Sequence, residues 1–284
     1  MNQAIQPAHL APASQRDIVA RTQGRGHRGI TRLVSPGDLG ELIKPFVFLD
    51  LFRMGGNHGR NGMGMHPHSG IATVTVVMEG ALEYRETTGQ QGVLSAGGVE
   101  FMNAGGGVWH GGSPHGEAGV AGFQLWLALP AEDENGPAHS QYLAPGQVQS
   151  SGPARVILGS YQGVASLIQP RAPITYLHVT LRDGEQWTYT PPAGHDVAWA
   201  AVGKGALAAG EALLESEVAV FEEGSGALRF TARGDTEFVL GSAARHPYPL
   251  VTGMYSVHTS AAALQKGESE ISRIGNQLHT AGLL

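Results

Sequence analysis

Short apolar runs, each ending in a glycine-rich turn, follow one another from residue 71 to residue 129. Runs of this length that are rich in Val, Ile and Thr favour β-strands, and turns this closely spaced are typical of an all-β sandwich or barrel. The expected strands cover residues 71–78, 81–86, 92–95, 99–103, 108–110 and 123–129. The first two are predicted to form a hairpin at Glu79-Gly80. A hydrophobic content of 42% argues against a disordered polymer despite the 42 glycines.

The second half of the chain looks like a degenerate copy of the first. Gly205 and its neighbours echo Gly80 and its neighbours within a similar strand–turn–strand pattern. When these two glycines are aligned, Pro191 and Ala193 stand opposite the histidines of the motif His66-Pro67-His68. We therefore expect two similar domains, of which only the first carries a histidine site.

The polar, proline-bounded segment 130–137 is the best candidate for a domain boundary. It divides the chain into an N-terminal domain, 25–137, and a C-terminal domain, 138–284. Residues 1–25 are rich in Pro, Gln and Ala without periodicity, and are expected to be a loose leader.

A single long helix is expected near the end of the chain, over residues 260–273. Ser260 is a suitable N-cap for the Ala-rich run that follows it. Gly267, a poor helix former, interrupts the pattern.

Charge and composition exclude several classes of function. The formal net charge is −6 and the basic residues are scattered, so no nucleic-acid partner is expected. No segment approaches the roughly 18 consecutive apolar residues of a membrane span, and no signal peptide is evident, which favours a cytoplasmic protein. The chain has no cysteine, so any metal must be held by histidine and carboxylate. Neither a serine-nucleophile elbow nor a phosphate-binding loop is found.

The motif His66-Pro67-His68 precedes the first β-run. Residues i and i+2 of a strand point to the same side, so both imidazoles are expected to face one space and to form the edge of a metal site. His110, which ends a glycine-rich turn and a short strand, is the natural third ligand. His58 and His115 are weaker candidates for the mouth of the pocket. Six other histidines have no special setting: His9, His139, His178, His195, His258 and His279.

The histidines lie within longer runs that together resemble the pirin family of the cupin superfamily. These runs are residues 45–50, 66–75, 98–110, 123–126 and 249–251, in matching order and spacing. The resemblance implies two stacked cupin barrels (double-stranded β-helices, or jelly rolls) with a short C-terminal helix. It also implies a single metal, often iron, in the N-terminal barrel. Some members are similar to flavonol 2,4-dioxygenases, and a eukaryotic branch acts as a nuclear cofactor of transcription.

The resemblance fails at both carboxylates that the family places near the metal. Gly112 stands where the family has a glutamate ligand, and Ala72 stands where a second glutamate is usual. A divalent metal with three neutral ligands keeps a local charge near +2 instead of about +1. Three alternatives follow. The three histidines bind metal with water, another group such as Glu100, Glu117 or His115 replaces the glutamate, or metal binds weakly or not at all.

The first functional hypothesis is a metal-dependent dioxygenase acting on a flavonol or related aromatic substrate. Its ligands would be His66, His68 and His110, the expected metal is divalent iron, and nickel, copper, cobalt, manganese and zinc are alternatives. Five apolar residues are candidates for the pocket lining: Phe48, Met63, Met65, Phe101 and Trp109. The alternative is a non-catalytic metal or redox sensor that regulates a partner protein, for which the sequence indicates no interface. A β-sandwich without metal is the third reading.

Overall fold

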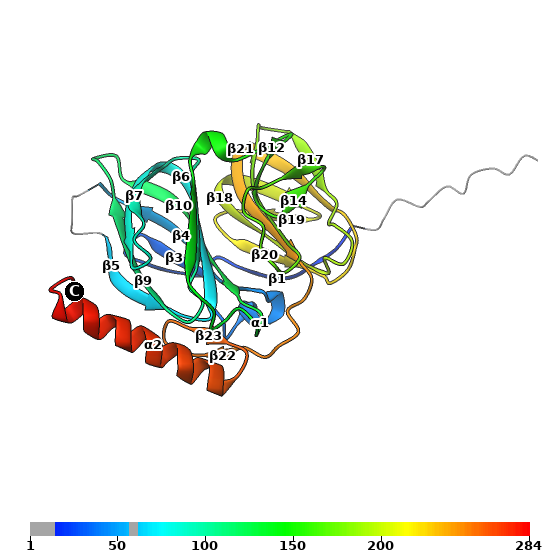
Figure 1. The fold of residues 1–284 in the computed structure, drawn as a ribbon. Helices are drawn as coiled ribbons and strands as arrows, with labels where there is room; N and C mark the ends of the chain where they lie inside the picture. Colours follow the sequence, from blue (N-terminus) through cyan, green and yellow to red (C-terminus); the bar gives the residue numbers. More distant parts are fainter. Residues whose placement is uncertain (1–14, 57–61) are drawn as a thin grey trace, which may run out of the picture.

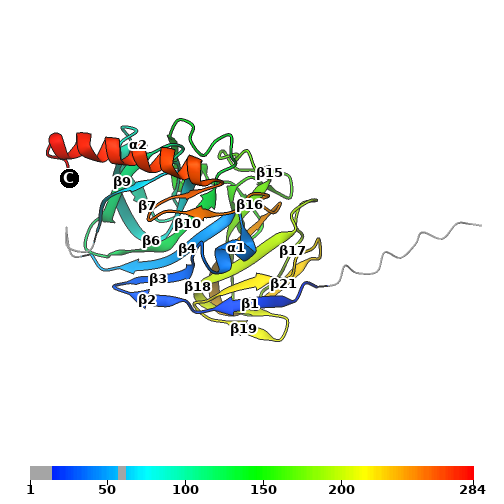
Figure 2. The same ribbon diagram turned by 90° about the horizontal axis from the view of Figure 1, so that it is seen from below.

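A computed structural model describes residues 15–56 and 62–284. Two β-barrels lie side by side, and one long helix runs across the outside of the N-terminal barrel (Figures 1 and 2). The predicted all-β class with two stacked cupin barrels and a C-terminal helix is confirmed. No helix within the described ranges is both long enough and apolar enough to cross a membrane.

The N-terminal barrel contains, among the described residues, a ten-stranded antiparallel sheet. Its main path runs β11-β8-β6-β10-β4-β3-β2. Off this path, β7 and β9 each pair with β6, and β5 pairs with β9. The strands are β2 (Arg25–His27), β3 (Ile30–Val34), β4 (Phe46–Met54), β5 (Met63–His68), β6 (Ile71–Glu86), β7 (Gln91–Ser95), β8 (Val99–Asn103), β9 (Val108–Pro114), β10 (Val120–Ala128) and β11 (His139–Leu143).

The C-terminal barrel contains nine strands within the same described part of the chain, with the main path β1-β20-β18-β21-β16-β13-β12. Its strands are β1 (Ile18–Thr22), β12 (Ser150–Ser151), β13 (Ala154–Leu158), β16 (Ile174–Leu181), β17 (Gln186–Tyr189), β18 (Val197–Ala209), β19 (Ala212–Leu214), β20 (Val218–Phe221) and β21 (Leu228–Ala243). The smaller elements are the pairs β14 (Ser160–Tyr161) with β15 (Val164–Ala165) and β22 (Val251–Thr252) with β23 (Val257–His258), helix α1 (Leu39–Ile43) and a 3-10 turn (Pro145–Gln147).

Strand pairing departs from the expected division of the chain in two places. Strand β1 falls in the expected leader, yet it pairs with β20 of the C-terminal barrel, and the Arg21 guanidinium lies 2.8 Å from a carboxylate oxygen of Glu217. The loose-leader prediction is therefore wrong for residues 18–22. Strand β11 begins beyond the expected boundary at 137, yet it pairs with β8 of the N-terminal barrel. The domain limits themselves stay a prediction.

Gly80 marks a bend inside one long strand, and the predicted hairpin at Glu79-Gly80 is wrong. Strand β6 pairs with β10 before the bend and with β7 after it, so it passes from one wall of the barrel to the other. A Cβ at Gly80 would lie 1.9 Å from the carbonyl oxygen of Gly119, and its φ is +73°. Gly205 has the same φ inside β18, which fits the predicted internal repeat.

The two barrels share one apolar core. Phe46 of β4 meets Trp199 of β18 edge to face, with ring centroids 5.3 Å apart, and both side chains are fully buried. Since the buried cluster around this pair draws on strands of both barrels, the second barrel supports the walls that carry the histidines.

The C-terminal helix α2 (Ala261–Thr280) begins after its predicted N-cap, Ser260, which accepts from the backbone N–H of Ala263. It ends beyond the expected residue 273, and Gly267 lies inside it without interrupting it. Gly267 is buried, and a Cβ there would lie 2.5 Å from the Ser69 hydroxyl oxygen. The indole N–H of Trp109 donates to the carbonyl of Ile271 at 2.7 Å, which ties α2 to the N-terminal barrel.

Candidate metal centre

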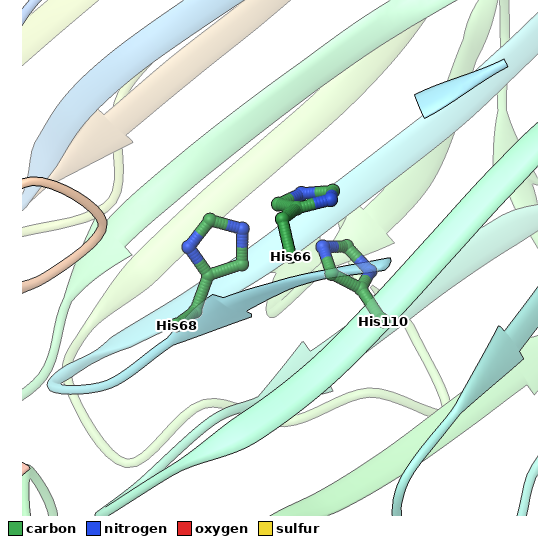
Figure 3. A group of neighbouring side chains, drawn as sticks. All are labelled: His66, His68 and His110. Atoms are coloured by element: carbon green, nitrogen blue, oxygen red, sulfur yellow. The ribbon is translucent and has the colours of Figure 1, made fainter. Parts of the chain in front are cut away.

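The structure brings together the three histidines that the sequence singles out. His66 and His68 lie on the same face of β5, as expected for residues i and i+2, and His66 stands directly opposite His110 of β9. One nitrogen from each ring lies within 4.8 Å of one nitrogen of each of the others. The rings converge on one point inside the barrel (Figure 3). Their role as ligands stays a prediction, but this buried cluster is able to hold a metal ion.

Backbone carbonyls fix the proton of two of these rings on Nδ1. The Nδ1 of His66 lies 2.8 Å from the carbonyl oxygen of Gly64, and the Nδ1 of His68 lies 2.9 Å from that of Tyr255. A carbonyl oxygen only accepts hydrogen bonds, so in each neutral ring Nδ1 carries the proton and Nε2 keeps its lone pair. This is the tautomer that a metal bound at Nε2 requires.

Glu100 of β8 lies beside the third ring. One of its carboxylate oxygens is 3.6 Å from Nδ1 of His110, and the other accepts a hydrogen bond from the Thr75 hydroxyl. The Nε2 atoms of His68 and His110 are buried and have no hydrogen-bond partner in the described structure. Unpartnered buried nitrogens are costly unless a ligand satisfies them, so the donor set fits a divalent metal.

Burial keeps the cluster uncharged. It lowers the pKa of His66, and it lowers the pKa of His68 and His110 to well below their usual range, with repulsion between the rings adding to the effect. Neutral imidazoles bind metal without first losing a proton. Burial also raises the pKa of Glu100 to about 7, against the lowering effects of the Thr75 hydrogen bond and of His66.

A cavity of about 20 Å³ adjoins the cluster, room for about one water molecule. Its wall includes Glu100, Gln124, Tyr84 and Met63. Gly112 also lines it, so the position where the family carries a glutamate faces the expected space. A Cβ at Gly112 would lie 3.0 Å from the carbonyl oxygen of Glu83, a tight but not prohibitive fit.

The remaining candidates lie elsewhere. His115 and Glu117 are exposed, and His58 lies outside the described residues. Of the five residues proposed for the pocket lining, Met63 alone lines this cavity. Phe48 instead stacks on Trp126, with ring centroids 4.0 Å apart. Phe101 packs in the core, Trp109 faces α2, and Met65 lines an outer groove.

A buried polar network next to His68 was missed by sequence reasoning. The Ser69 hydroxyl lies 2.8 Å from that of Ser256 and 3.0 Å from Nε2 of His258, whose Nδ1 is 3.2 Å from a carboxylate oxygen of Glu134. All four residues are buried. His258 therefore does have a special setting, and Glu134 of the expected boundary segment is a structural residue. Because Ser256 follows Tyr255, this network holds the carbonyl that orients His68.

Two cupin barrels define the protein as a bicupin, and within its described residues the cluster of His66, His68 and His110 in the N-terminal barrel has the geometry to hold a metal ion. The family model described as Pirin matches residues 30–127. A pirin-like protein of Caulobacter vibrioides is 30% identical over 243 residues, 78% of this chain and 81% of the relative. The chain belongs to the pirin family.

One further protein resembles the chain in sequence, and two solved structures resemble it in fold. A Pseudomonas aeruginosa protein provisionally named quercetin 2,3-dioxygenase PA2418 is 29% identical over 238 residues, 78% of this chain and 82% of the relative. The crystal structure of quercetin 2,3-dioxygenase from Acinetobacter baumannii shares the fold, with a TM-score of 0.82, 24% identity and coverage of 92% and 98% of the two chains. The structure of the Escherichia coli pirin YhhW in complex with nickel(II) aligns with a TM-score of 0.64, 19% identity and coverage of 81% and 98%.

Proposed function

We propose that this pirin-family bicupin binds one divalent transition metal through His66, His68 and His110 and oxidises a small aromatic substrate with dioxygen. The observation that carries the proposal is the convergence of three imidazoles, of which two have Nδ1 committed to carbonyl acceptors and two have buried, unpartnered Nε2 atoms. Iron is the first expectation. Nickel is the leading alternative, since the E. coli pirin YhhW was solved in complex with it.

The protein orients the histidine ligands, excludes water from the cluster and leaves one side of the metal position open. A divalent metal, when bound, provides a Lewis-acidic and redox-active centre for oxygen chemistry. Hydrogen bonds at Nδ1 hold the rings of His66 and His68 in the orientation that binding requires. Gly112 supplies no side chain to the cluster, which leaves more coordination positions for substrate and oxygen than a glutamate there would.

The accessible side of the cluster lies next to the turn between β22 and β23. His66 is the least buried of the three histidines, and the Tyr255 ring centroid lies 6.3 Å from its own. Tyr255 is 38% exposed and Met254 is 83% exposed. An aromatic ring and a thioether at this edge suit a planar aromatic substrate, in keeping with the quercetin-related names of two relatives.

The test combines metal analysis with oxygen consumption. Elemental analysis of protein purified without added metal should give one metal per chain, and the loaded protein should consume oxygen when the flavonol quercetin is present. His66→Ala should abolish both. His115→Ala is the matched control, since it removes an exposed histidine, and it should leave both unchanged. Equal oxygen consumption by metal-free protein would refute the proposal.

The size of the cavity favours a second candidate function. A space of about 20 Å³ beside the histidines holds about one water molecule and no flavonol. A metal or redox sensor that regulates a partner protein needs no larger space. This function requires binding to a cellular partner that differs between Fe(II)- and Fe(III)-loaded protein and is lost when all three histidines are replaced by alanine. Unchanged binding by that triple variant would contradict it.

A further inference from the structure

We infer that Glu100 is the outer-sphere carboxylate of the metal centre: it acts through Nδ1 of His110 and replaces the charge, but not the coordination position, of the glutamate absent at Gly112. The inference rests on the proposed metal binding. It assigns Glu100 as a positioning residue for His110, whereas Gly64 and Tyr255 perform that task for His66 and His68 with neutral carbonyls.

The surroundings of Glu100 hold its carboxylate in place. Strands β8 and β6 pair so that Glu100 stands directly opposite Thr75, and the Thr75 hydroxyl donates to one of the carboxylate oxygens. The other oxygen is thereby directed toward the His110 ring, 3.6 Å from Nδ1. Glu100 is only 4% exposed, so water does not screen its interaction with the ring.

Which nitrogen of the His110 ring Glu100 faces decides whether Glu100 is a direct metal ligand or an outer-sphere residue. The carboxylate lies at Nδ1, whereas the unpartnered nitrogen of His110 is Nε2. Among the described residues, the convergent group of candidate ligand atoms contains the three histidines and no carboxylate. Glu100 therefore lies behind His110 as seen from the metal position.

This arrangement has an electrostatic consequence. Three neutral imidazoles leave the charge of a divalent metal uncompensated, and the ionised form of a carboxylate one ring away lowers the local charge without occupying a coordination position. At 3.6 Å the carboxylate oxygen lies beyond hydrogen-bond distance of Nδ1, so Glu100 acts on the ring through its charge. Loss of partners in this outer position ordinarily weakens metal binding by about 10- to 100-fold.

The experiment compares Glu100→Gln and Glu100→Ala with the control Glu86→Gln, using Co(II) as the probe. Glu86 is another buried glutamate of the same barrel and stands opposite His110 in the pairing of β6 with β9, but its carboxylate accepts from the Ser140 hydroxyl and not from a histidine. We expect the Kd for Co(II), measured by calorimetry, to rise about 10-fold for the glutamine variant and more for the alanine variant. The control should stay within twofold of the wild type. The visible absorption of bound Co(II), which reports the coordination number, should keep its intensity in all variants.

A metal-free measurement completes the test. Long-range ¹H–¹⁵N NMR spectra of the apoprotein should show the His110 proton on Nδ1 in the wild type and a mixture of tautomers in Glu100→Ala. Wild-type protein that binds no Co(II) would overturn the proposed metal function. Normal wild-type binding with unchanged Kd values in both Glu100 variants would overturn only the role of Glu100. A change in Co(II) intensity in Glu100→Gln would instead make Glu100 a direct ligand and overturn the outer-sphere assignment.

Discussion

Replacing Gly267 by alanine tests whether the network beneath α2 is as tightly packed as the structure indicates. Alanine is the best helix former, and Gly→Ala in a helix interior ordinarily stabilises by about 1 kcal/mol. At this position the added Cβ would lie 2.5 Å from the hydroxyl oxygen of Ser69 and 2.6 Å from Nε2 of His258. Neither atom is free to move, because Ser69 is bonded to Ser256 and His258 is held by Glu134.

The steric effect should outweigh the gain in helix propensity. Overpacking a tight interior costs about 1–3 kcal/mol. Separating Ser69 from His258 leaves a buried polar group without its partner, which costs about another 1–3 kcal/mol. After the gain of about 1 kcal/mol from propensity, a net loss of about 3 kcal/mol remains, or on the order of 10 °C in Tm for a chain of this size.

The assay is urea and thermal denaturation of the apoprotein followed by circular dichroism. Asn276→Ala is the matched control, since Asn276 lies on the exposed side of the same helix and only propensity acts there. We expect the control to raise Tm slightly and Gly267→Ala to lower it. A Tm of Gly267→Ala equal to or above that of Asn276→Ala would refute the packing argument.

Three further predictions concern the metal centre. Gly112→Glu should tighten Co(II) binding in calorimetry by adding a carboxylate from the cavity wall; unchanged affinity would mean that the strand at Gly112 does not direct the side chain to the metal. Removing metal with a chelator should lower Tm, and readding one equivalent should restore it, whereas His68→Asn protein should show neither change. Burial lowers the pKa of His68, so below pH 6.5 the unfolded chain binds a proton that the native chain does not. The free energy of unfolding therefore decreases as the pH is lowered, by up to about 1.4 kcal/mol per pH unit. Urea denaturation between pH 5 and 7 should therefore give a shallower slope for His68→Asn, and equal slopes would contradict a neutral buried His68.

Much of the fold was predictable because the sequence pattern of a strand is local. The errors arose where the structure depends on pairing between residues far apart in the sequence. Residues 71–86 contain a glycine between two apolar runs, which describes a hairpin and a bent strand equally well. Only the close approach of Gly119 to Gly80 decides between them, and that contact involves a residue far along the chain. Strand β1 was missed for a related reason, since apolar and polar residues do not alternate in its sequence and its stability comes from pairing with β20.

The same holds for the metal site: the sequence identifies its candidate ligands, but not the groups that face them from distant parts of the chain. Strand periodicity was enough to place His66 and His68 on one face, since that depends only on their spacing. The groups that face Nδ1 of the three rings are scattered along the chain: Gly64 is two residues from His66, whereas Glu100 and Tyr255 reach His110 and His68 through the folding of other strands. The candidate ligands were thus readable from the motif and their tautomers were not. Since a histidine binds metal only through a deprotonated nitrogen, these distant acceptors, and not the spacing of the motif, decide whether the cluster is ready to bind.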